Sequence, residues 1–301
     1  YKIYEMEHPD VLLWAVWAMQ QYAKETSREQ CRQKYGELLK DIMEYIRQRK
    51  HDNLFLHENG LLYANGTEKA ITWMNSTVNG HPVIPRTGYI VEFNALWYNA
   101  LKIMEELSRE FGDDSLEYEN IANKVKSSFN ERFWNEEKSC LYDVVDKNDD
   151  KIRPNQIWAV SLPFSILDIE KEKKIVNTVY KHLYATYGLR SLSFMDKEYK
   201  SKYIGKLFDR DCAYHMGTTW GFLIGGFISA YCKVHRHDKK ANHMCKVFED
   251  TMNDGCINGI AEIFDGDFAC TGRGCYSQAW SVAEVLRAYS QDVLPYLNKF
   301  H

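Results

Sequence analysis

The strongest constraint on the fold is a helical spacing of apolar residues that recurs along most of the 301 residues. The stretch "DVLLWAVWAMQQYAKE", which starts at Asp10, places apolar side chains every three or four residues, as one face of an amphipathic helix does. Asp10 is predicted to be the N-cap of this helix. A second helix is expected to start at Ser27, because Ser27 and Gln30 form a capping-box pattern ahead of the apolar series from Cys31 to Ile46.

Further segments with the same spacing predict a chain made mostly of helices. They cover residues 91–109, 115–134, 156–168, 170–185, 213–236, 238–252 and 277–291. Only short β signals interrupt this pattern, such as "LLYAN" and "CLYDVV", which predict small hairpins in the loops. Roughly nine or ten helices in succession therefore predict an all-α fold in which helical hairpins form a ring.

The loops between these helices are unequal in length. Segments 51–90 and 186–212 are long, and a third, 253–276, is rich in Gly and Asp. Long loops inside a compact domain usually carry function, so candidate site residues are sought there. Because no Pro- or Ser-rich linker divides the chain, residues 1–301 are interpreted as a single domain.

Charge and composition exclude several classes of partner. A net charge of -4 and a pI of about 6.2 give no basic footprint for nucleic acid or anionic lipid. No apolar run approaches the roughly 20 residues of a membrane span. The eight cysteines are scattered without a Cys-x-x-Cys pair, which favours reduced thiols and a cytoplasmic location. The chain begins at Tyr1 rather than Met, so removal of a signal peptide stays open.

Common catalytic motifs are missing from the sequence. It contains no phosphate-binding P-loop, no dinucleotide-binding glycine pattern, no H-E-x-x-H metal motif and no G-x-S-x-G nucleophile elbow. The cysteines lack metal-ligand spacing. A Cys–His nucleophilic pair is not excluded by the sequence, although nothing supports one.

Carboxylates on loops among aromatic residues are the remaining candidates for chemistry. The three stretches that carry them are "GIAEIFDGD" with Glu262, "FDRDCAYHMGTTW" with Asp211, and "TGYIVEFNALWYNAL" with Glu92. Each acid has a local alternative as a solvated group, a helix cap or an ion-pair partner. Taken together, and in a chain with 14% aromatic residues, they favour an acid-rich face for a small polyhydroxylated ligand.

These stretches also resemble one known family. "TWMN", "PVIPRTGYIVEFNALWYNALKIM", "IRPNQIWAVSLPFSIL", "YATYGLRSLS", "DRDCAYHMGTTW", "GIAEIFDGD" and "RGCYSQAWSVAEVLRAY" are similar, in this order, to the glucosidase domain at the C-terminal end of glycogen debranching enzymes, the amylo-α-1,6-glucosidase part. The resemblance implies an (α/α)6 toroid, a barrel of six helical hairpins with the active site at its loop end. It also implies inverting hydrolysis of α-1,6-linked glucose at branch stubs of glycogen or dextrin. No metal or organic cofactor is implied, and the expected partner is an oligosaccharide or branched α-glucan.

The resemblance assigns two catalytic positions, and one of them departs from the family pattern. The general base falls on Glu262. The general acid falls on position 75, where Asn75 replaces the aspartic acid of the family and has no proton with a usable pKa. Glu92 is the only other nearby acid considered as a substitute, and its surroundings favour substrate binding or helix capping instead.

A second departure concerns the N-terminus. "HPDVLLWAVWAM" resembles the third helix of the family barrel, so the domain is expected to lack its first hairpin. A partner chain or a missing N-terminal segment would then cover the open seam.

Three functions follow from these observations. The leading one is an α-1,6-glucosidase with Asn75 at the acid position. The others are a catalytically silent carbohydrate-binding homologue and a different hydrolase or lyase on the same barrel. The expected substrate-binding residues are Trp73, Glu92, Asn94, Trp97, Asn155, Gln156, Arg210, Asp211, His215, Trp220 and Gln278.

Overall fold

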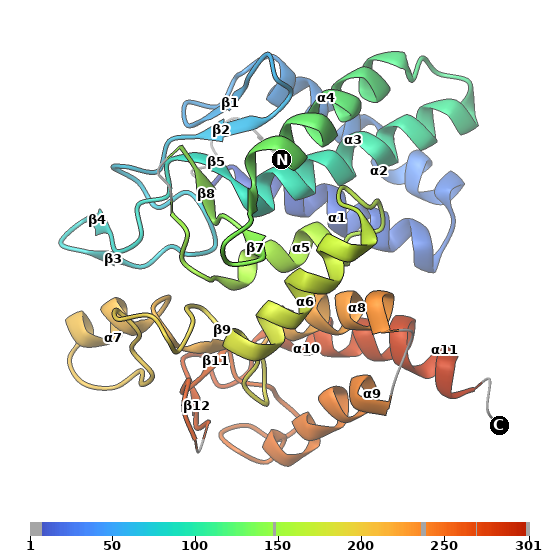
Figure 1. The fold of residues 1–301 in the computed structure, drawn as a ribbon. Coiled ribbons are helices and arrows are strands. Elements are labelled where there is room, and N and C mark those ends of the chain that lie inside the picture. Colours follow the sequence, from blue (N-terminus) through green and yellow to red (C-terminus); the bar gives the residue numbers. More distant parts are fainter. Residues whose placement is uncertain (1–7, 147–148, 236–238, 269, 299–301) are drawn as a thin grey trace. The chain divides into compact units, whose positions relative to one another are not determined.

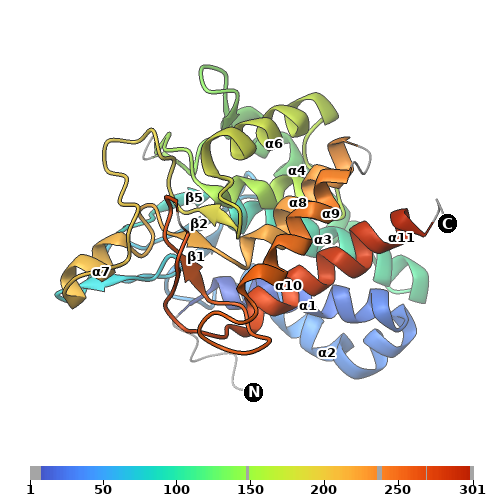
Figure 2. The ribbon, with the colours of Figure 1, turned by 90° about the horizontal axis from the view of Figure 1, so that it is seen from below.

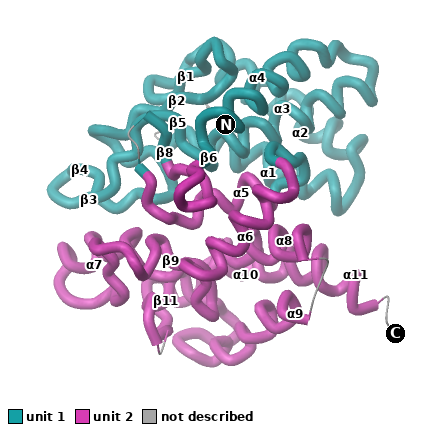
Figure 3. The backbone as a smooth tube through the Cα atoms, viewed as in Figure 1, with its two compact units in different colours: residues 1–134, 144–149, 162–167 teal, residues 135–143, 150–161, 168–301 magenta. Residues whose placement is uncertain are grey.

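The computed structural model describes residues 8–146, 149–235, 239–268 and 270–298. Its chain divides into two compact units, which Figure 3 distinguishes by colour. Unit 1 comprises residues 1–134, 144–149 and 162–167, and unit 2 comprises residues 135–143, 150–161 and 168–301. Each unit is described separately.

Unit 1 is built around a buried helix, α3. Its four long helices are α1 (Asp10–Glu25), α2 (Arg28–Arg47), α3 (Val91–Phe111) and α4 (Leu116–Arg132), visible in Figure 1. α1 packs against α2 and α3 packs against α4, so that each consecutive pair forms a helical hairpin. α3 also contacts α1 and α2 and is buried on nearly every side over most of its length, as a helix in the centre of a core must be.

A small antiparallel sheet completes unit 1. Its strands are β1 (Leu54–Leu56), β2 (Leu62–Ala64), β5 (Gly88–Ile90) and β8 (Val144–Val145), hydrogen-bonded in the order β1-β2-β5-β8. The register places Tyr63 opposite Tyr89, and Tyr89 opposite Val145. A separate hairpin joins β3 (Thr77–Val78) and β4 (His81–Pro82).

Unit 2 is built around a second buried helix, α8 (Leu223–His235). It packs against α5 (Trp158–Ser161), α6 (Ile169–Leu183), α9 (Lys239–Lys246) and α10 (Ala279–Ala288). The π-helical segment η4 (Tyr289–Val293) joins α10 to α11 (Leu294–Leu297), and Figure 2 shows the two helices following one another. The remaining described helices of this unit are η2 (Pro154–Ile157), α7 (Leu207–Ala213) and η3 (Val247–Thr251).

Short strands in unit 2 form a second antiparallel sheet in the order β12-β11-β10-β9. They are β9 (Leu189–Arg190), β10 (Thr219–Trp220), β11 (Ile263–Phe264) and β12 (Gly272–Arg273). Two more strands, β6 (Trp134–Asn135) and β7 (Cys140–Leu141), lie near the boundary of the units in sequence. The sheet β12-β11-β10-β9 therefore joins loop segments that are far apart along the chain.

The predominantly helical character predicted from the sequence is confirmed, and most helix ends fall within two or three residues of their predicted positions. Ser27 is the N-cap of α2, since its hydroxyl accepts the backbone N–H of Gln30 at 3.1 Å. The strand predicted in "LLYAN" is β2, but "CLYDVV" divides between β7 and β8. Pairing of β2 with β5, and of β5 with β8, depends on contacts distant in sequence, which a local pattern does not reveal.

Three local predictions are wrong. Asp10 is not the N-cap of α1, because Pro9 holds that position with helical dihedral angles and Asp10 already lies in the first turn. The helix predicted at 156–168 ends at Ser161, since Pro163 disfavours helical geometry in the residue before it. The helix predicted at 213–236 begins only at Leu223, because β10 and a Gly217 with φ of 147° interrupt the segment before it.

Asn94 provides a test of how α3 is held in unit 1. Its carbonyl accepts the Leu62 N–H at 2.7 Å, and its amide donates to Leu62 O at 3.0 Å and to Ile90 O at 2.9 Å. Asn94→Ala removes these three bonds from buried backbone groups and is expected to lower the free energy of unfolding by about 3 kcal/mol. Urea denaturation measures the loss.

The matched control is Asn123→Ala, a change of the same type on the exposed face of α4, which should stay within about 0.5 kcal/mol of the wild type. Equal stability of the two variants would contradict a structural role for the Asn94 amide.

Candidate active site

Glu262 lies immediately before β11 in unit 2, and its backbone is fixed on both sides. Its N–H donates to Cys275 O at 2.9 Å, and its carbonyl accepts the Gly221 N–H at 3.2 Å. These bonds extend the ladder of the second sheet by one residue. The position of the Glu262 side chain is therefore set by the sheet rather than by a free loop.

The Glu262 carboxylate accepts hydrogen bonds from three donors. Tyr214 Oη donates to Oε1 at 2.7 Å, and the Cys275 N–H donates to Oε2 at 3.0 Å. Gln278 Nε2 lies 3.5 Å from Oε1, at the long limit for a hydrogen bond. An ionised carboxylate has about four acceptor sites, so one on Oε2 stays available for another donor. The side chain is half-buried, which leaves it within reach of solvent.

Aromatic rings surround the Tyr214 hydroxyl. The Tyr214 ring packs against Tyr203, His215 and Trp220 with centroid distances of 5.3, 4.7 and 4.8 Å. Burial, followed by the hydrogen bond to Glu262, raises the pKa of Tyr214 far above its ordinary value. The phenol therefore stays protonated at neutral pH, where it donates to the carboxylate.

Helix α7 brings Arg210 and Asp211 to the same cluster. The Arg210 guanidinium lies 5.9 Å from the centre of the Tyr203 ring. Burial raises the pKa of Tyr203, Arg210 lowers it, and Asp211 and Glu262 add smaller upward effects. Because these charges act on one phenol, the predicted residues Arg210, Asp211 and Glu262 lie around it.

Unit 2 thus gathers six of the predicted site residues near one another. They are Arg210, Asp211, His215, Trp220, Glu262 and Gln278. Sequence reasoning missed Tyr203 and Tyr214 as neighbours of Glu262, although Tyr214 stands inside one of the quoted motifs. The Cys275 N–H was also missed, because a backbone donor leaves no trace in residue identity.

Asn155 and Gln156 are buried and bonded inside unit 2. Asn155 Nδ2 donates to Asp143 Oδ1 at 2.7 Å. Gln156 Oε1 accepts the Leu141 N–H at 3.1 Å, and its amide donates to Arg153 O at 3.1 Å. These bonds attach η2 to the segment around β7, so both side chains serve the fold.

The candidates of unit 1 are also mostly internal. Trp97 is fully buried in α3 and donates its indole N–H to Gly60 O at 3.2 Å, and Asn94 is bonded to the backbone as described above. Glu92 is 0% exposed and forms a two-pronged ion pair with Arg86, one prong at 2.7 Å. Both oxygens of the Glu92 carboxylate are therefore occupied by the guanidinium.

Trp73 and Asn75 lie in the loop before β3. Trp73 is buried, and Asn75 is exposed. The Trp73 backbone is bonded to Asp10, a carboxyl that is only 4% exposed. Burial, reinforced by the charge of Glu92, raises the Asp10 pKa to about 7, although bonds from Trp14, Val11 and Trp73 oppose the shift. Sequence reasoning treated Asp10 as a helix cap and so missed this buried carboxyl.

Two kinds of site are not found in the described part of the chain. No group of three or more His, Cys, Asp or Glu side chains among these residues is arranged to hold a metal ion. Within the same residues, no helix is long and apolar enough to cross a membrane.

Asp10 makes the stability of the protein depend on pH. Its pKa is higher in the folded protein than its ordinary value of 3.8, so the stability that this group contributes is fully present below about pH 4 and is lost as the pH rises toward 7. Between pH 5 and pH 8 the free energy of unfolding of the wild type should fall by about 2–3 kcal/mol relative to that of Asp10→Asn. Urea denaturation at the two pH values measures this difference.

Asp41→Asn, on the exposed face of α2, removes the same charge without burial and serves as the control. A stability difference between wild type and Asp10→Asn that does not change with pH would contradict the raised pKa.

Comparison with known proteins adds to this geometry. No curated protein sequence matches the chain. Among solved structures, a GH63 mannosylglycerate hydrolase from Thermus thermophilus, in complex with glucose, matches with a TM-score of 0.67 at 12% identity, covering 95% of this chain and 76% of that one. An uncharacterized conserved protein of the same organism matches with a TM-score of 0.67 at 13% identity, covering 95% and 77%.

A protein described as a sialidase matches with a TM-score of 0.66 at 15% identity over 85% of this chain and 24% of its own. At these identities the likeness concerns the fold alone. The family described as amylo-alpha-1,6-glucosidase, however, matches residues 4–287, which include every predicted site residue and nearly the whole chain. The chain belongs to the amylo-alpha-1,6-glucosidase family.

Proposed function

We propose that this chain is an inverting glucosidase domain for α-1,6-linked glucose at branch stubs, with Glu262 as its general base. The single observation that carries the proposal is the Glu262 carboxylate, held by Tyr214, Cys275 and Gln278 in a half-buried aromatic setting. Family membership supports the same assignment. Inverting hydrolysis needs a carboxylate that removes a proton from water, and an oriented, partly solvated glutamate suits that step.

The step assigned to Glu262 is proton transfer from water. Tyr214 and Cys275 fix the two oxygens of the carboxylate, and one acceptor site on Oε2 stays open for a water molecule. As the water attacks the anomeric carbon, its proton moves to the Glu262 carboxylate. Orientation by fixed donors lowers the barrier, because the carboxylate does not have to reorganise during the reaction.

Asn75 limits the reaction that this chain performs. At the position of the general acid, an amide holds the glycosidic oxygen by a hydrogen bond and supplies no proton. Loss of a general acid lowers the rate typically about 10²–10⁴-fold. Glu92 does not replace the acid, since Arg86 holds it as an ion pair. The chain is therefore proposed to bind branched α-glucan and to cleave its glucosidic bonds very slowly.

The geometry also narrows the binding residues that we propose. Arg210, Asp211 and Gln278 lie beside Glu262 and are suited to sugar hydroxyls, while His215 and Trp220 form the aromatic wall behind Tyr214. Trp73 is kept because it lies two residues from Asn75. Five residues leave the proposed set because their polar groups or rings are engaged inside the protein: Glu92, Asn94, Trp97, Asn155 and Gln156.

The barrel architecture and the cellular compartment of the protein belong to the same proposal. We propose a single domain with the (α/α)6 toroid fold, and the helical hairpins α1–α2 and α3–α4 of unit 1 support the hairpin as its repeating element. All eight cysteines are free thiols, which supports a reducing compartment such as the cytoplasm.

A second candidate function is a carbohydrate-binding homologue without turnover, and the observation in its favour is Asn75. A third is a different glycosidase on the same fold, which is favoured by the likeness to a mannosylglycerate hydrolase.

Restoring the acid tests the leading proposal. Asn75→Asp should release glucose as the β anomer from a glucosyl-α-1,6 branched dextrin, at a rate at least about 100-fold above the wild type. Proton NMR follows the anomer. Adding Glu262→Gln to this variant should abolish the release and leave the helical circular dichroism unchanged. If Asn75→Asp binds the dextrin without cleaving it, the carbohydrate-binding alternative holds instead.

An activated substrate tests Glu262 independently of Asn75. Fluoride leaves α-glucosyl fluoride without protonation, so the wild-type chain should hydrolyse this compound although its acid is missing. Release of fluoride, measured with an ion-selective electrode, should disappear in Glu262→Gln. Equal release by both proteins would rule out Glu262 as the base.

Tyr214→Phe tests how the base is positioned. The change removes a 2.7 Å hydrogen bond to a charged group and is expected to lower kcat for α-glucosyl fluoride about 10–100-fold, with little change in KM. Tyr180→Phe is the control, because Tyr180 loses the same hydroxyl from a separate ring cluster on α6, packed against Tyr184 and Phe227. Equal kcat values for the two variants would mean that Tyr214 serves packing alone.

A further inference from the structure

The turn after α2 in unit 1 contains an unusual residue. The helix ends at Arg47, Gln48 is its C-cap, and Arg49 follows with φ of 54°, in the left-handed region. Two backbone bonds close the turn, from the Arg49 N–H to Ile46 O at 3.1 Å and from the Lys50 N–H to Tyr45 O at 3.2 Å. This is a Schellman motif, in which the left-handed position is normally glycine. An arginine here is strained, and strain of this kind often marks a functional site.

Charge at the helix end does not explain the choice. A cation is favourable near a helix C-terminus, but Lys50 is the next residue and supplies that charge outside the left-handed position. The surface that the Arg49 side chain lines offers another reason for an arginine at this position.

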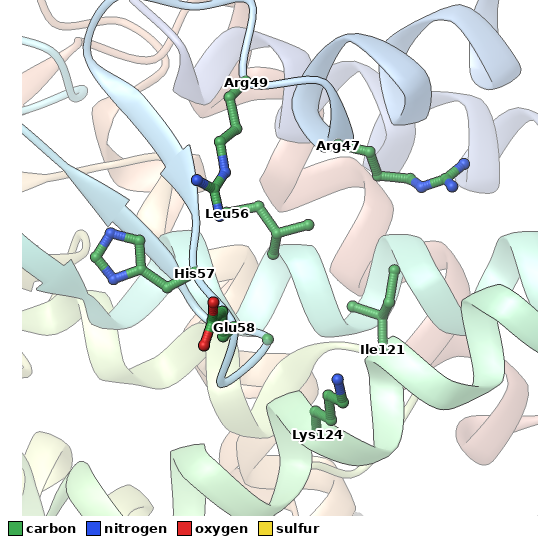
Figure 4. Close-up of a pocket in the computed structure, with 8 residues that line it drawn as sticks. Arg47, Arg49, Leu56, His57, Glu58, Ile121 and Lys124 are labelled. Carbon is green, nitrogen blue, oxygen red and sulfur yellow. The ribbon is translucent and has the colours of Figure 1, made fainter.

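Arg49 lines a pair of adjoining hollows in unit 1. One, of about 170 Å³, is also lined by His57, Glu58 and Lys124, and the other, of about 350 Å³, by His57, Glu58, Asn59 and Tyr89. In Figure 4 the Arg49 side chain extends toward His57 from the turn after α2, while Lys124 approaches from α4. We call this surface the Arg49 hollow.

The cations of the Arg49 hollow differ in how they are paired. Arg47 forms ion pairs with Glu44 at 2.9 Å and with Glu117, and in Figure 4 it points away from Arg49. Arg49 and Lys124, by contrast, have no carboxylate partner among the described residues. Glu58 is the one carboxylate of the described lining and is exposed. The hollow therefore carries two unpaired cations against one solvated acid.

His57 adds a ring nitrogen to this surface. Its Nδ1 lies 2.8 Å from Tyr89 Oη, and its ring is stacked on Tyr63 at 5.2 Å. Burial lowers the pKa of His57, and the charge of Arg49 lowers it further; Asp146 opposes the shift and Arg132 adds to it. With Nδ1 engaged by Tyr89, Nε2 is the nitrogen left to face a ligand.

We propose that Arg49, His57 and Lys124 form a binding site for a phosphate group, either free or carried by a small phosphorylated molecule. The Arg49 guanidinium supplies a planar fork for two phosphate oxygens, and Lys124 adds a point charge. A neutral sugar is less suited to the site, because the aromatic rings on which a sugar would stack are covered. Arg132 lies over the Tyr89 ring at 4.7 Å, and Tyr63 covers one face of the His57 ring. The site does not depend on the proposed glucosidase function.

Titration with inorganic phosphate at constant ionic strength tests the site, with the His57 ring followed by NMR. Saturable shifts of the ring signals and a rise in the His57 pKa are expected, because a bound anion favours the imidazolium. Arg49→Gln and Lys124→Gln should each weaken binding about tenfold. Lys126→Gln removes the same charge from α4 outside the lining and should leave binding unchanged.

Two more variants sharpen the test. Arg49→Gly should weaken phosphate binding as much as Arg49→Gln does and should also raise the melting temperature, because glycine relieves the left-handed strain. Glu58→Gln should tighten phosphate binding, because it removes the carboxylate of the lining. A hexose phosphate that binds more tightly than inorganic phosphate would identify an ester as the ligand, and equal binding would identify free phosphate.

Several results would overturn the site. They are shifts that do not saturate, equal effects of Lys126→Gln and Lys124→Gln, or a loss of binding in Glu58→Gln. Saturable shifts of His57 by a neutral maltooligosaccharide, without an effect of phosphate, would make the hollow a sugar site instead.

Discussion

The near-complete burial of α3 and α8 is the constraint on which the rest of each unit depends. A helix surrounded on all sides has no solvent-facing stripe, so every polar side chain that it carries must find a partner inside the protein. On α3 this requirement explains why Glu92 pairs with Arg86 and why the Asn94 amide is bonded to β2 and to the residue before its own helix. In the sequence alone, Glu92 and Asn94 belong to a motif of the resembled family, and for that reason they were predicted to bind substrate.

The surroundings of three carboxyl groups differ, and their chemistry differs accordingly. Glu262 is half-buried and accepts bonds from neutral donors, Glu92 is sealed in an ion pair, and Asp10 is buried beside another acid, which raises its pKa to about 7. Burial, charge and hydrogen bonding are the three causes that shift a carboxyl group between acid, base and structural roles. Of these three groups, Glu262 alone combines orientation with access to water.

Local strain and unpaired charge distinguish the Arg49 hollow from the candidate active site. Glu262 is positioned by a sheet and by the rings around Tyr214, so its surroundings resist movement. Arg49 instead occupies a turn in which glycine would be more stable, and no described carboxylate neutralises its charge. Such a residue lowers the stability of the fold. Natural sequences keep strained residues of this kind mainly at functional sites.

The sequence by itself determined the helices and the family, because both depend on short-range patterns. Apolar spacing and the Ser27 cap located α1 and α2, and a series of motifs in order identified the family without any contact information. Glu262 also emerged from its motif, and Asn75 marked the missing acid.

Tertiary structure alone decided which of the candidate residues face one another. Tyr214 and the Cys275 N–H meet Glu262 only because β10, β11 and β12 align, and Asp10 becomes a buried acid only because Trp73 and Glu92 lie beside it. Burial and partner identity depend on contacts between residues far apart in the chain, and these contacts set the pKa values and roles of carboxyl groups that are alike in sequence.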